Sequence, residues 1–315
     1  MNVKTLGIAV AAGIACVLAI YSALHAGAAG FPLLMLGALP VYIVALGWGT
    51  HAGVAASVMA ILASATLVSP QAAVAIGLSL TIPASIIGHQ ANLAQETGDG
   101  QMEWYPLSQL LFNLALIISI VLVIMGYMMD YNSYSQSPEI SNAVKDFLRQ
   151  NPPPTPLTDE EVAQLTQSVF RLLPFMFSGI WLIVHVMNLQ LAALVCRGSG
   201  ILPRPKDNIP ATIDMPKAGL LFLVGSLLAI IVLDGPLQSA AAVFTGVFLM
   251  AYALVGLAAT HQQARNNPAT YIFLILSYII IVLFFAPLFL FAIGGVLRTF
   301  SNSKTSPPSA GQNHS

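Results

Sequence analysis

Residues 171–196 read RLLPFMFSGIWLIVHVMNLQLAALVC, and residues 197–217 continue as RGSGILPRPKDNIPATIDMPK. The first stretch is an apolar run longer than the ~20 residues that a helix needs to cross a hydrocarbon layer of about 30 Å, so it predicts a transmembrane helix. The second stretch is polar, rich in proline and basic, and short basic loops stay in the cytoplasm. We therefore expect the helix to enter from outside and to end inside, followed by the basic residues Arg197, Arg204, Lys206 and Lys217.

The composition of the whole chain is that of a membrane protein. Of its 315 residues, 57% are hydrophobic and 7% are charged, whereas soluble proteins carry about 25% charged residues. The mean hydropathy is +0.81. The net charge of -1 at pH 7 gives no general attraction for nucleic acid. The two cysteines, Cys16 and Cys196, lie in different apolar runs and suggest neither a disulfide nor a metal pair.

The apolar runs predict an all-α fold, a polytopic membrane helix bundle with about nine transmembrane helices. In lipid such runs must be helices, because an open strand leaves backbone groups unpaired. The transmembrane domain is expected over 1–298, and the Ser-, Pro- and Asn-rich residues 299–315 predict a disordered tail. The first run also resembles a signal peptide, but it is longer than such a segment usually is, so we expect it to be retained. The spans are expected at 5–25, 31–49, 52–68, 72–88, 106–129, 172–196, 218–233, 238–260 and 270–297.

The lysines and arginines predict the orientation of the chain. With Lys4 in the cytoplasm, alternation of the spans places segment 131–171 outside and the basic loop 197–217 inside. The tail that carries Arg298 finishes outside if the last apolar run is one helix, and inside if that run folds back at Pro287. The sequence leaves both possibilities open.

Three of the first four predicted helices carry small residues at every fourth position. In lipid, helices associate through close van der Waals approach, which small side chains permit. These ladders fit packing within the chain, and the first also fits docking onto a partner membrane protein because its helix is terminal. Pro40 and Pro83 predict kinks in the second and fourth helices. The ladders are Ala11, Ala15, Ala19 and Ala23; Ala52, Ala56, Ala60 and Ser64; and Ala73, Gly77, Thr81 and Ser85.

Segment 131–171 predicts a helical hairpin outside the membrane. Ser137 followed by proline is typical of a helix start, and this helix should run to about Arg149. A stiff spacer, NPPPTP, follows. Thr158 and Glu161 then form a capping box that opens a second helix, whose inward residues should be Val162, Leu165 and Val169. The hairpin is expected to rest on the bundle, either as a fixed cap or as a lid over a binding site.

Polar side chains inside a predicted span supply the main candidate site. Trp181, His185 and Asn188 are spaced by four and three residues, which places them on one helix face. An ionisable group such as His185 is costly at membrane depth and often functional. Ligand binding is one interpretation, with Asn113 of the fifth span as a further member of the site. The alternatives are a structural hydrogen bond between Asn113 and Asn188 and, less favoured, proton chemistry.

Charged residues at the expected outer boundary form a second candidate cluster. Asp130, Arg171 and Asp234 should lie at one level, where the arginine can pair with the carboxylates or bind a charged ligand. The sequence contains no phosphate-binding loop, HExxH zinc motif, nucleophile elbow or CxxC pair. We therefore expect neither an enzyme nor a resident cofactor or metal, and we assign no catalytic residue. The basic loop 197–217 fits topology retention, or binding of anionic lipid head groups or of a cytosolic partner.

Four segments carry a resemblance to a known family. The chain resembles the YybS-like family of predicted bacterial membrane proteins, in its alphaproteobacterial form, a domain of unknown function. The resemblance implies a bacterial membrane protein whose role is no better defined than that of the family. Together with the charge pattern, which places the N-terminus in the cytoplasm, we expect a multi-pass protein of the bacterial inner (cytoplasmic) membrane. The segments are LPVYIVALGWG at 39–49, WYPLSQLL at 104–111, NLQLAALVCRGSGILPRP at 188–205 and GLAATHQQAR at 256–265.

More distantly, residues 1–196 are similar to the substrate-binding S subunits of energy-coupling-factor transporters. GWGTHAGVAAS at 47–57 and the alanine face of the first helix carry this likeness. It implies a core of about six helices, an outward-facing small-molecule site and docking onto a transmembrane coupling subunit. Three further helices and the hairpin depart from that pattern. We therefore expect either a small-solute-binding or transport component, with its ligand unidentified, or a non-catalytic membrane scaffold that binds partner proteins.

Overall fold

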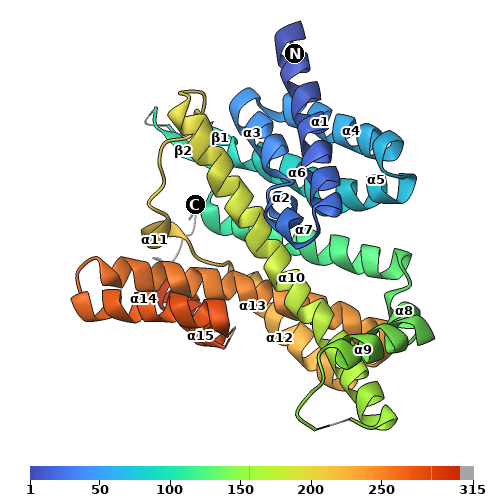
Figure 1. Ribbon diagram of the computed structural model, residues 1–315. Coiled ribbons are helices and arrows are strands. Elements are labelled where there is room, and N and C mark those ends of the chain that lie inside the picture. Colours follow the sequence, from blue (N-terminus) through green and yellow to red (C-terminus); the bar gives the residue numbers. More distant parts are fainter. Residues whose placement is uncertain (99, 156, 285, 306–315) are drawn as a thin grey trace, which may run out of the picture.

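The computed structural model describes residues 1–98, 100–155, 157–284 and 286–305, and these fold mainly as helices (Figure 1). The elements are α1 (Val3–His25), η1 (Gly27–Gly30), α2 (Phe31–Met35), α3 (Leu39–Trp48), α4 (Thr50–Leu67), α5 (Pro70–Ile76), the π-helix η2 (Gly77–Thr81), α6 (Ile82–Ala91), β1 (Ala94–Glu96), β2 (Met102–Trp104), α7 (Leu107–Met128), α8 (Tyr131–Ser135), α9 (Pro138–Gln150), α10 (Asp159–Gly198), α11 (Ile209–Thr212), α12 (Lys217–Val232), α13 (Gly235–Ala264), α14 (Pro268–Leu283) and α15 (Pro287–Thr305).

Within the described residues, seven helical segments are long and apolar enough to cross a membrane, which confirms the prediction of a polytopic membrane protein. Three shorter apolar helices, α12, α14 and α15, follow or flank them. The predicted ninth span at 270–297 is wrong as a single helix, because α14 ends at Leu283 and α15 begins at Pro287. The seven long segments are Val3–His25, Gly27–Trp48, Thr50–Leu67, Pro70–Ala91, Leu107–Met128, Asp159–Gly198 and Gly235–Ala264.

The break before Pro287 brings the end of α15 back to the basic loop 197–217. Arg298 donates from Nη1 to the carbonyl oxygen of Pro210 over 3.0 Å and from Nη2 to that of Ala211 over 2.8 Å. Thr299 donates to Asp214 over 2.8 Å. The end of α15 therefore lies beside the basic loop, the arrangement expected if the last apolar run folds back at Pro287.

A second contact joins the basic loop to the connection between α6 and α7. Arg204 is buried, and its Nη1 donates to the carbonyl oxygens of Ala91 and Tyr105 over 3.3 and 2.9 Å. Its Nε lies 2.8 Å from an Asp207 carboxylate oxygen. The same connection holds the antiparallel pair β1–β2, in which Ala94 pairs with Trp104. In Figure 1 this pair, the N-terminus and the end of α10 all lie in the upper part, away from α8 and α9.

The small-residue ladders of α4 and of the fourth span are buried, as packing within the chain requires. Ala52, Ala56, Ala60 and Ser64 are inaccessible or nearly so. The helix facing them is α1, where a Cβ on Gly13 would lie 2.6 Å from the Ala56 carbonyl oxygen. Close approach of two helix backbones thus joins the first and third spans.

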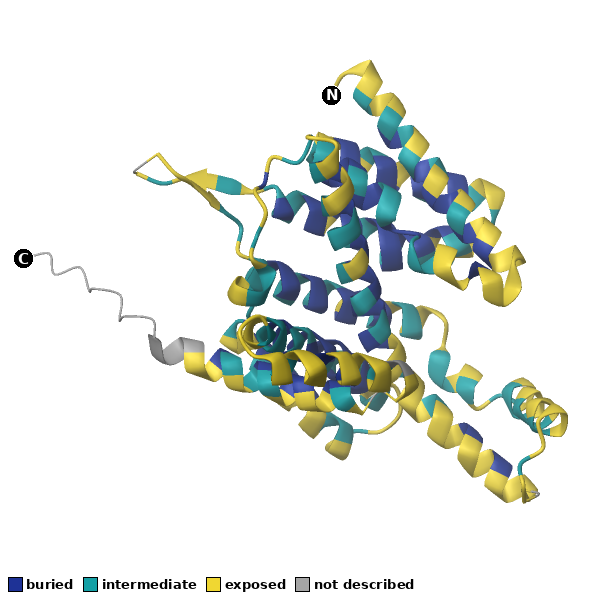
Figure 2. Cartoon of the chain, turned by 60° about the vertical axis from the view of Figure 1, so that its left-hand side comes forward, coloured by how far each residue is buried: buried dark blue, intermediate teal, exposed yellow. Residues whose placement is uncertain are grey.

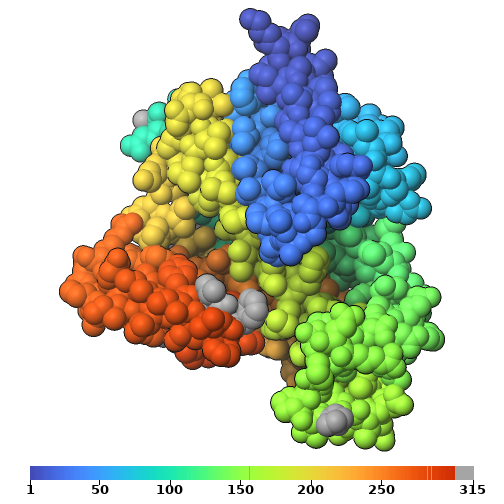
Figure 3. Space-filling model, in the orientation of Figure 1, coloured from blue at the N-terminus to red at the C-terminus, as the bar shows by residue number. Residues whose placement is uncertain are grey.

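The hairpin of α9 and the first turns of α10 stands apart from this core, as Figures 2 and 3 show. No residue of α9 is buried. Of the residues predicted to point inward on the second helix, Val162 is 6% exposed, whereas Leu165 and Val169 are 41% and 45% exposed. The prediction is wrong for these two because α10 has 40 residues, about 60 Å, roughly twice the thickness of a hydrocarbon core. Its first turns therefore project beyond the bundle.

Candidate functional site: a buried seam and a hairpin cavity

The face predicted from Trp181, His185 and Asn188 is buried between α10 and the second and fourth spans. His185 Nε2 lies 2.8 Å from the Ser79 carbonyl oxygen, and Nδ1 lies 3.1 Å from the Tyr42 hydroxyl. Trp181 Nε1 donates to the same Ser79 oxygen over 2.9 Å. Because a carbonyl only accepts, His185 carries its proton on Nε2 and accepts from Tyr42 at Nδ1. We call these five residues the buried seam.

Pro83 explains why the Ser79 carbonyl is available. Proline has no backbone N–H, so the carbonyl four residues earlier lacks its usual helix partner. The chain around Ser79 is also wound as a π-helix. A freed carbonyl at membrane depth must be satisfied by a neighbouring helix, and Trp181 and His185 do this. Polar side chains of α10 thus repair a break in the fourth span.

Asn188 supplies a hydrogen bond at a break in the second span, where α2 ends at Met35. Its Nδ2 donates to the Met35 carbonyl oxygen over 2.7 Å, where α2 ends, and to the Val184 carbonyl oxygen over 2.7 Å. Asn113 lies elsewhere and donates to Gln90 Oε1 over 3.1 Å and to the Tyr105 hydroxyl over 3.0 Å. The structure therefore brings together three of the four residues of the predicted site, and Asn113 and Asn188 do not pair.

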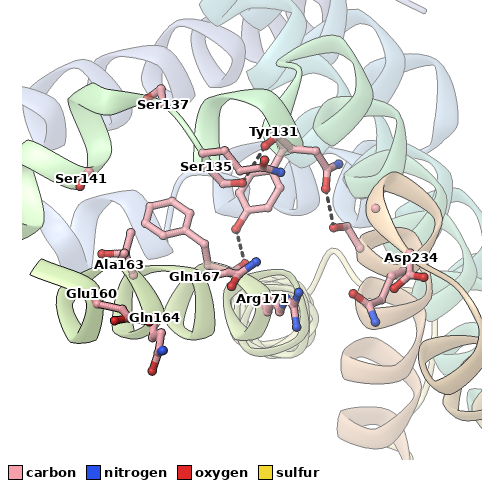
Figure 4. A pocket seen from close by; sticks show the side chains of 17 residues that line it. Tyr131, Ser135, Ser137, Ser141, Glu160, Ala163, Gln164, Gln167, Arg171 and Asp234 are labelled. Atoms are coloured by element: carbon pink, nitrogen blue, oxygen red, sulfur yellow. Dashed lines mark hydrogen bonds between the residues drawn. The ribbon is translucent and has the colours of Figure 1, made fainter.

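A cavity lies under the hairpin, at the opposite end of α10 from the basic loop. Its polar chamber has a volume of about 560 Å³ and lies between α8, the start of α9, the first turns of α10 and the start of α13 (Figure 4). No seam residue lines it. The Ser137 hydroxyl faces this region without a hydrogen-bond partner among the described residues. The polar lining includes Ser137, Gln164, Gln167, Arg171, Asp234 and Gln238.

An apolar chamber of about 360 Å³ adjoins the polar one. It lies between α7, α10 and α13, and it shares Tyr131, Asn132 and Ser239 with the polar chamber. We call the two chambers together the hairpin cavity. The apolar lining includes Met125, Met129, Leu173, Phe177, Ala240 and Val243.

A second proline fixes the roof of the cavity. Pro174 lies inside α10 and cannot donate to the carbonyl of Phe170. The Tyr131 hydroxyl donates to that Phe170 oxygen over 2.7 Å, as a dashed line in Figure 4 shows. The neighbouring Asn132 accepts from the Ser239 hydroxyl over 3.0 Å. These two bonds tie α8 to α10 and to α13.

The chain turns sharply into α8 at Asp130, whose φ is +46°. Aspartate adopts this left-handed conformation more readily than most residues. Asp130, Arg171 and Asp234 are all exposed, and no ion pair within the described parts of the chain includes any of them. The predicted ion pair is therefore not formed, although Arg171 and Asp234 both line the polar chamber.

An ion pair joins the two arms of the hairpin. Lys145 Nζ on α9 lies 2.7 Å from an Asp159 carboxylate oxygen on α10. The hydrogen bond and the charge of Lys145 lower the pKa of Asp159 below its ordinary value of 3.8. The predicted capping box is present, since Glu161 N donates to Thr158 Oγ1 over 3.3 Å and Thr158 N donates to Glu161 over 2.8 Å. Hydrogen bonds from the Thr158 backbone and side chain lower the pKa of Glu161.

The alanine ladder of α1 is partly free. Ala11 and Ala15 are exposed, Ala19 is half-buried, and Ala23 is buried below Gly30, where a Cβ would overlap the Ala23 backbone. The contact with α4 uses Gly13 on another side of the helix. Only the first half of the predicted docking face is therefore accessible.

No protein-family model, curated protein or solved structure matches the chain. Within the described residues, no three His, Cys, Asp or Glu side chains are grouped so as to hold a metal ion. Sequence reasoning missed Tyr131 and Ser239, which define the cavity. The signal for Tyr131 was Pro174, because a proline inside a helix marks a free carbonyl four residues earlier.

Proposed function

We propose that this protein is a small-solute-binding or transport component of the membrane, and that its solute occupies the hairpin cavity. The main support for this proposal is the pair of adjoining chambers, about 560 and 360 Å³ in volume. The two chambers share the lining residues Tyr131, Asn132 and Ser239. Both volumes fall within the ~300–1,000 Å³ common for ligand sites. The proposal moves the solute away from His185, whose two ring nitrogens are already bonded within the protein.

The hairpin is suited to act as the lid of this site. No residue of α9 is buried, and few bonds hold the hairpin: Tyr131 to Phe170, Asn132 to Ser239 and Lys145 to Asp159. Elements with few buried contacts open at a low free-energy cost. Opening of α8 and α9 away from α10 gives the solute a route to the polar chamber.

The orientation of the protein supports an extracytoplasmic site. The loop 197–217 and Arg298 gather at one side, and basic segments of this kind stay in the cytoplasm. The hairpin cavity lies toward the other end of α10. With the inner membrane of a bacterium as the host, as the YybS-like resemblance implies, the cavity receives solute from outside the cell.

The proposal is tested by filling the junction of the two chambers. Ser239→Trp places an indole where the chambers meet, whereas Ser239→Ala removes the hydroxyl and leaves the space open. Each full-length protein is purified in mild detergent, and the small molecules extracted from it are identified by mass spectrometry. We expect a compound that accompanies the wild type and Ser239→Ala and is lost from Ser239→Trp. Identical extracts from all three proteins, with folding unchanged, would exclude solute binding in this cavity.

A scaffold function is the second candidate, and the exposed Ala11 and Ala15 favour it. A helix face of small residues that is free in the monomer is suited to close packing with a partner helix, including a transmembrane coupling subunit of the kind that the S-subunit likeness implies. Ala11→Leu with Ala15→Leu should then release a protein that co-purifies with the wild type. The same pair of changes should leave the small-molecule extract unaltered.

A further inference from the structure

The two chambers differ in chemistry but share a boundary, and this contrast restricts what fills both. Hydroxyl, amide and charged groups share the lining of the polar chamber with apolar atoms, and they contribute far more of it than polar groups contribute to the apolar chamber. Side chains of α7, α10 and α13 such as Met125, Phe177 and Val243 line the apolar one. Burying apolar surface contributes about 25 cal/mol per Å², while a polar group placed in the apolar chamber would lose its hydrogen bonds. A molecule that fills the whole cavity must therefore be polar at one end and apolar at the other.

The charges of the polar chamber define its polar end. Arg171 on α10 and Asp234 before α13 lie at one end of the chamber in Figure 4, and Glu160 lies at the other. Glu160 precedes Arg171 by 11 residues on one helix, or about 16 Å along its axis. Neither Arg171 nor Asp234 has an ionic partner among the described residues. A ligand with a negative and a positive group satisfies both, whereas a purely anionic head is repelled by Asp234.

The apolar chamber is reached from the side of the helices rather than from water. Met129, Leu173 and Phe177 line it and are 71%, 38% and 48% exposed. They lie near the ends of the predicted fifth and sixth spans, where we expect their exposed surfaces to meet lipid. A hydrocarbon tail can enter the chamber directly from the bilayer. A fully water-soluble solute would leave this apolar wall without a partner.

We propose that the hairpin cavity binds a zwitterionic amphiphile of the phospholipid type, with its phosphate on Arg171, its ammonium group on Asp234 and one hydrocarbon tail along Phe177. This inference rests on the proposed function and specifies the ligand class for the same site.

The test measures lipid retention by the purified full-length protein. The protein is delipidated in mild detergent and titrated separately with phosphatidylethanolamine, phosphatidylglycerol and diacylglycerol, and bound lipid is counted by native mass spectrometry. Phosphatidylethanolamine should bind at least about tenfold more tightly than phosphatidylglycerol, which lacks the ammonium group, and more tightly still than diacylglycerol, which lacks both charged groups. Equal binding of the three lipids would mean bulk lipid association only and would overturn the inference.

Matched variants locate the binding. Arg171→Gln and Asp234→Asn should each weaken phosphatidylethanolamine binding about tenfold, and Phe177→Ala should weaken the binding of all three lipids. Arg149→Gln is the control, because Arg149 is exposed on α9, pairs with Asp146 and does not line the cavity. A loss equal to that of the control would contradict the assignment of Arg171. If no lipid binds selectively but Ser239→Trp loses a water-soluble compound, the ligand class is wrong and the proposed function stands; if neither occurs, both fail.

Discussion

The buried seam and the roof of the hairpin cavity are held by the same kind of bond in different surroundings. In the seam, Trp181 and His185 bond to the carbonyl that Pro83 leaves free, and they are 6% and 0% exposed. In the roof, Tyr131 bonds to the carbonyl that Pro174 leaves free, beside a helix without a buried residue. The two bonds of the seam are enclosed by packed helices, whereas the bond of the roof joins α8 to α10 beside the exposed α9.

The two regions differ in whether their polar groups are already hydrogen-bonded within the protein. The hydrogen-bonding capacity of His185 is filled by Tyr42 and Ser79, so a ligand there would have to break bonds within the protein. Arg171 and Asp234 line the polar chamber and have no ionic partner among the described residues. Within the described part of the chain, the seam side-chain atom that lacks a hydrogen-bond partner is Asn188 Oδ1. The polar atoms of Trp181 and His185 are used by the fold, whereas that oxygen is not.

The largest expected effect comes from disrupting the packing of α10 against α13. Both the buried seam and the hairpin cavity depend on this packing. A Cβ on Gly246 would overlap the Phe175 carbonyl and the Ser178 hydroxyl. Gly246→Val should therefore lower the free energy of unfolding by about 3 kcal/mol or more, measured by thermal and chemical unfolding in detergent. Gly225→Val on α12 is the control, since nothing lies within 4 Å of that position, and an equal loss there would contradict the packing.

The second effect distinguishes the seam from the cavity. His185→Ala leaves a void and removes the bonds to Tyr42 and Ser79, so it should cost about 2–3 kcal/mol of stability. The folded fraction should still retain the compound or lipid that the wild type retains, measured by mass spectrometry at a temperature where the variant is folded. Loss of retention without loss of stability would return the binding site to the seam.

A smaller effect is expected at the roof. Tyr131→Phe removes the hydroxyl bond to Phe170 and should cost about 1 kcal/mol locally. Hydrogen exchange should then quicken in α8 and α9 but not in the helices of the seam. Tyr134→Phe is a suitable control because Tyr134 is 54% exposed on the same short helix. Unchanged exchange in Tyr131→Phe would mean that the bond does not hold the lid.

The smallest expected effect is that the separation of α9 from α10 depends on pH. Lys145 lowers the pKa of Asp159 below 3.8, so this ion pair contributes fully above the unfolded value and is lost as the pH falls through the folded value. The distribution of distances between spin labels on α9 and α10 should therefore broaden as the pH falls below about 4, and it should not change between pH 6 and pH 8. Lys145→Gln should broaden it already at neutral pH. A distribution that is independent of pH would rule out this latch.

The sequence was sufficient for the elements whose cause is local. Apolar length predicted nine spans, and seven of them correspond to long apolar helices among the described residues, whereas 218–233 and 270–297 correspond to shorter ones. The Thr158–Glu161 spacing predicted the start of α10. The sequence was not sufficient where a cause and its effect lie far apart in the chain. Pro83 marked a kink, and Trp181 and His185 marked a polar face, but their connection through Ser79 depends on how the helices pack. Asn113 was misplaced for the same reason, because depth in the membrane does not define which helices are neighbours.

The most direct test is a map of the protein in lipid nanodiscs, obtained by electron cryomicroscopy at a resolution that shows side chains. We expect non-protein density in the hairpin cavity, with a head near Arg171 and Asp234 and a tail along Phe177. The seam should show His185 bonded to Tyr42 and Ser79 as described. Density that contacts His185 instead, or an empty hairpin cavity beside a water-filled path to Ser79, would contradict the account.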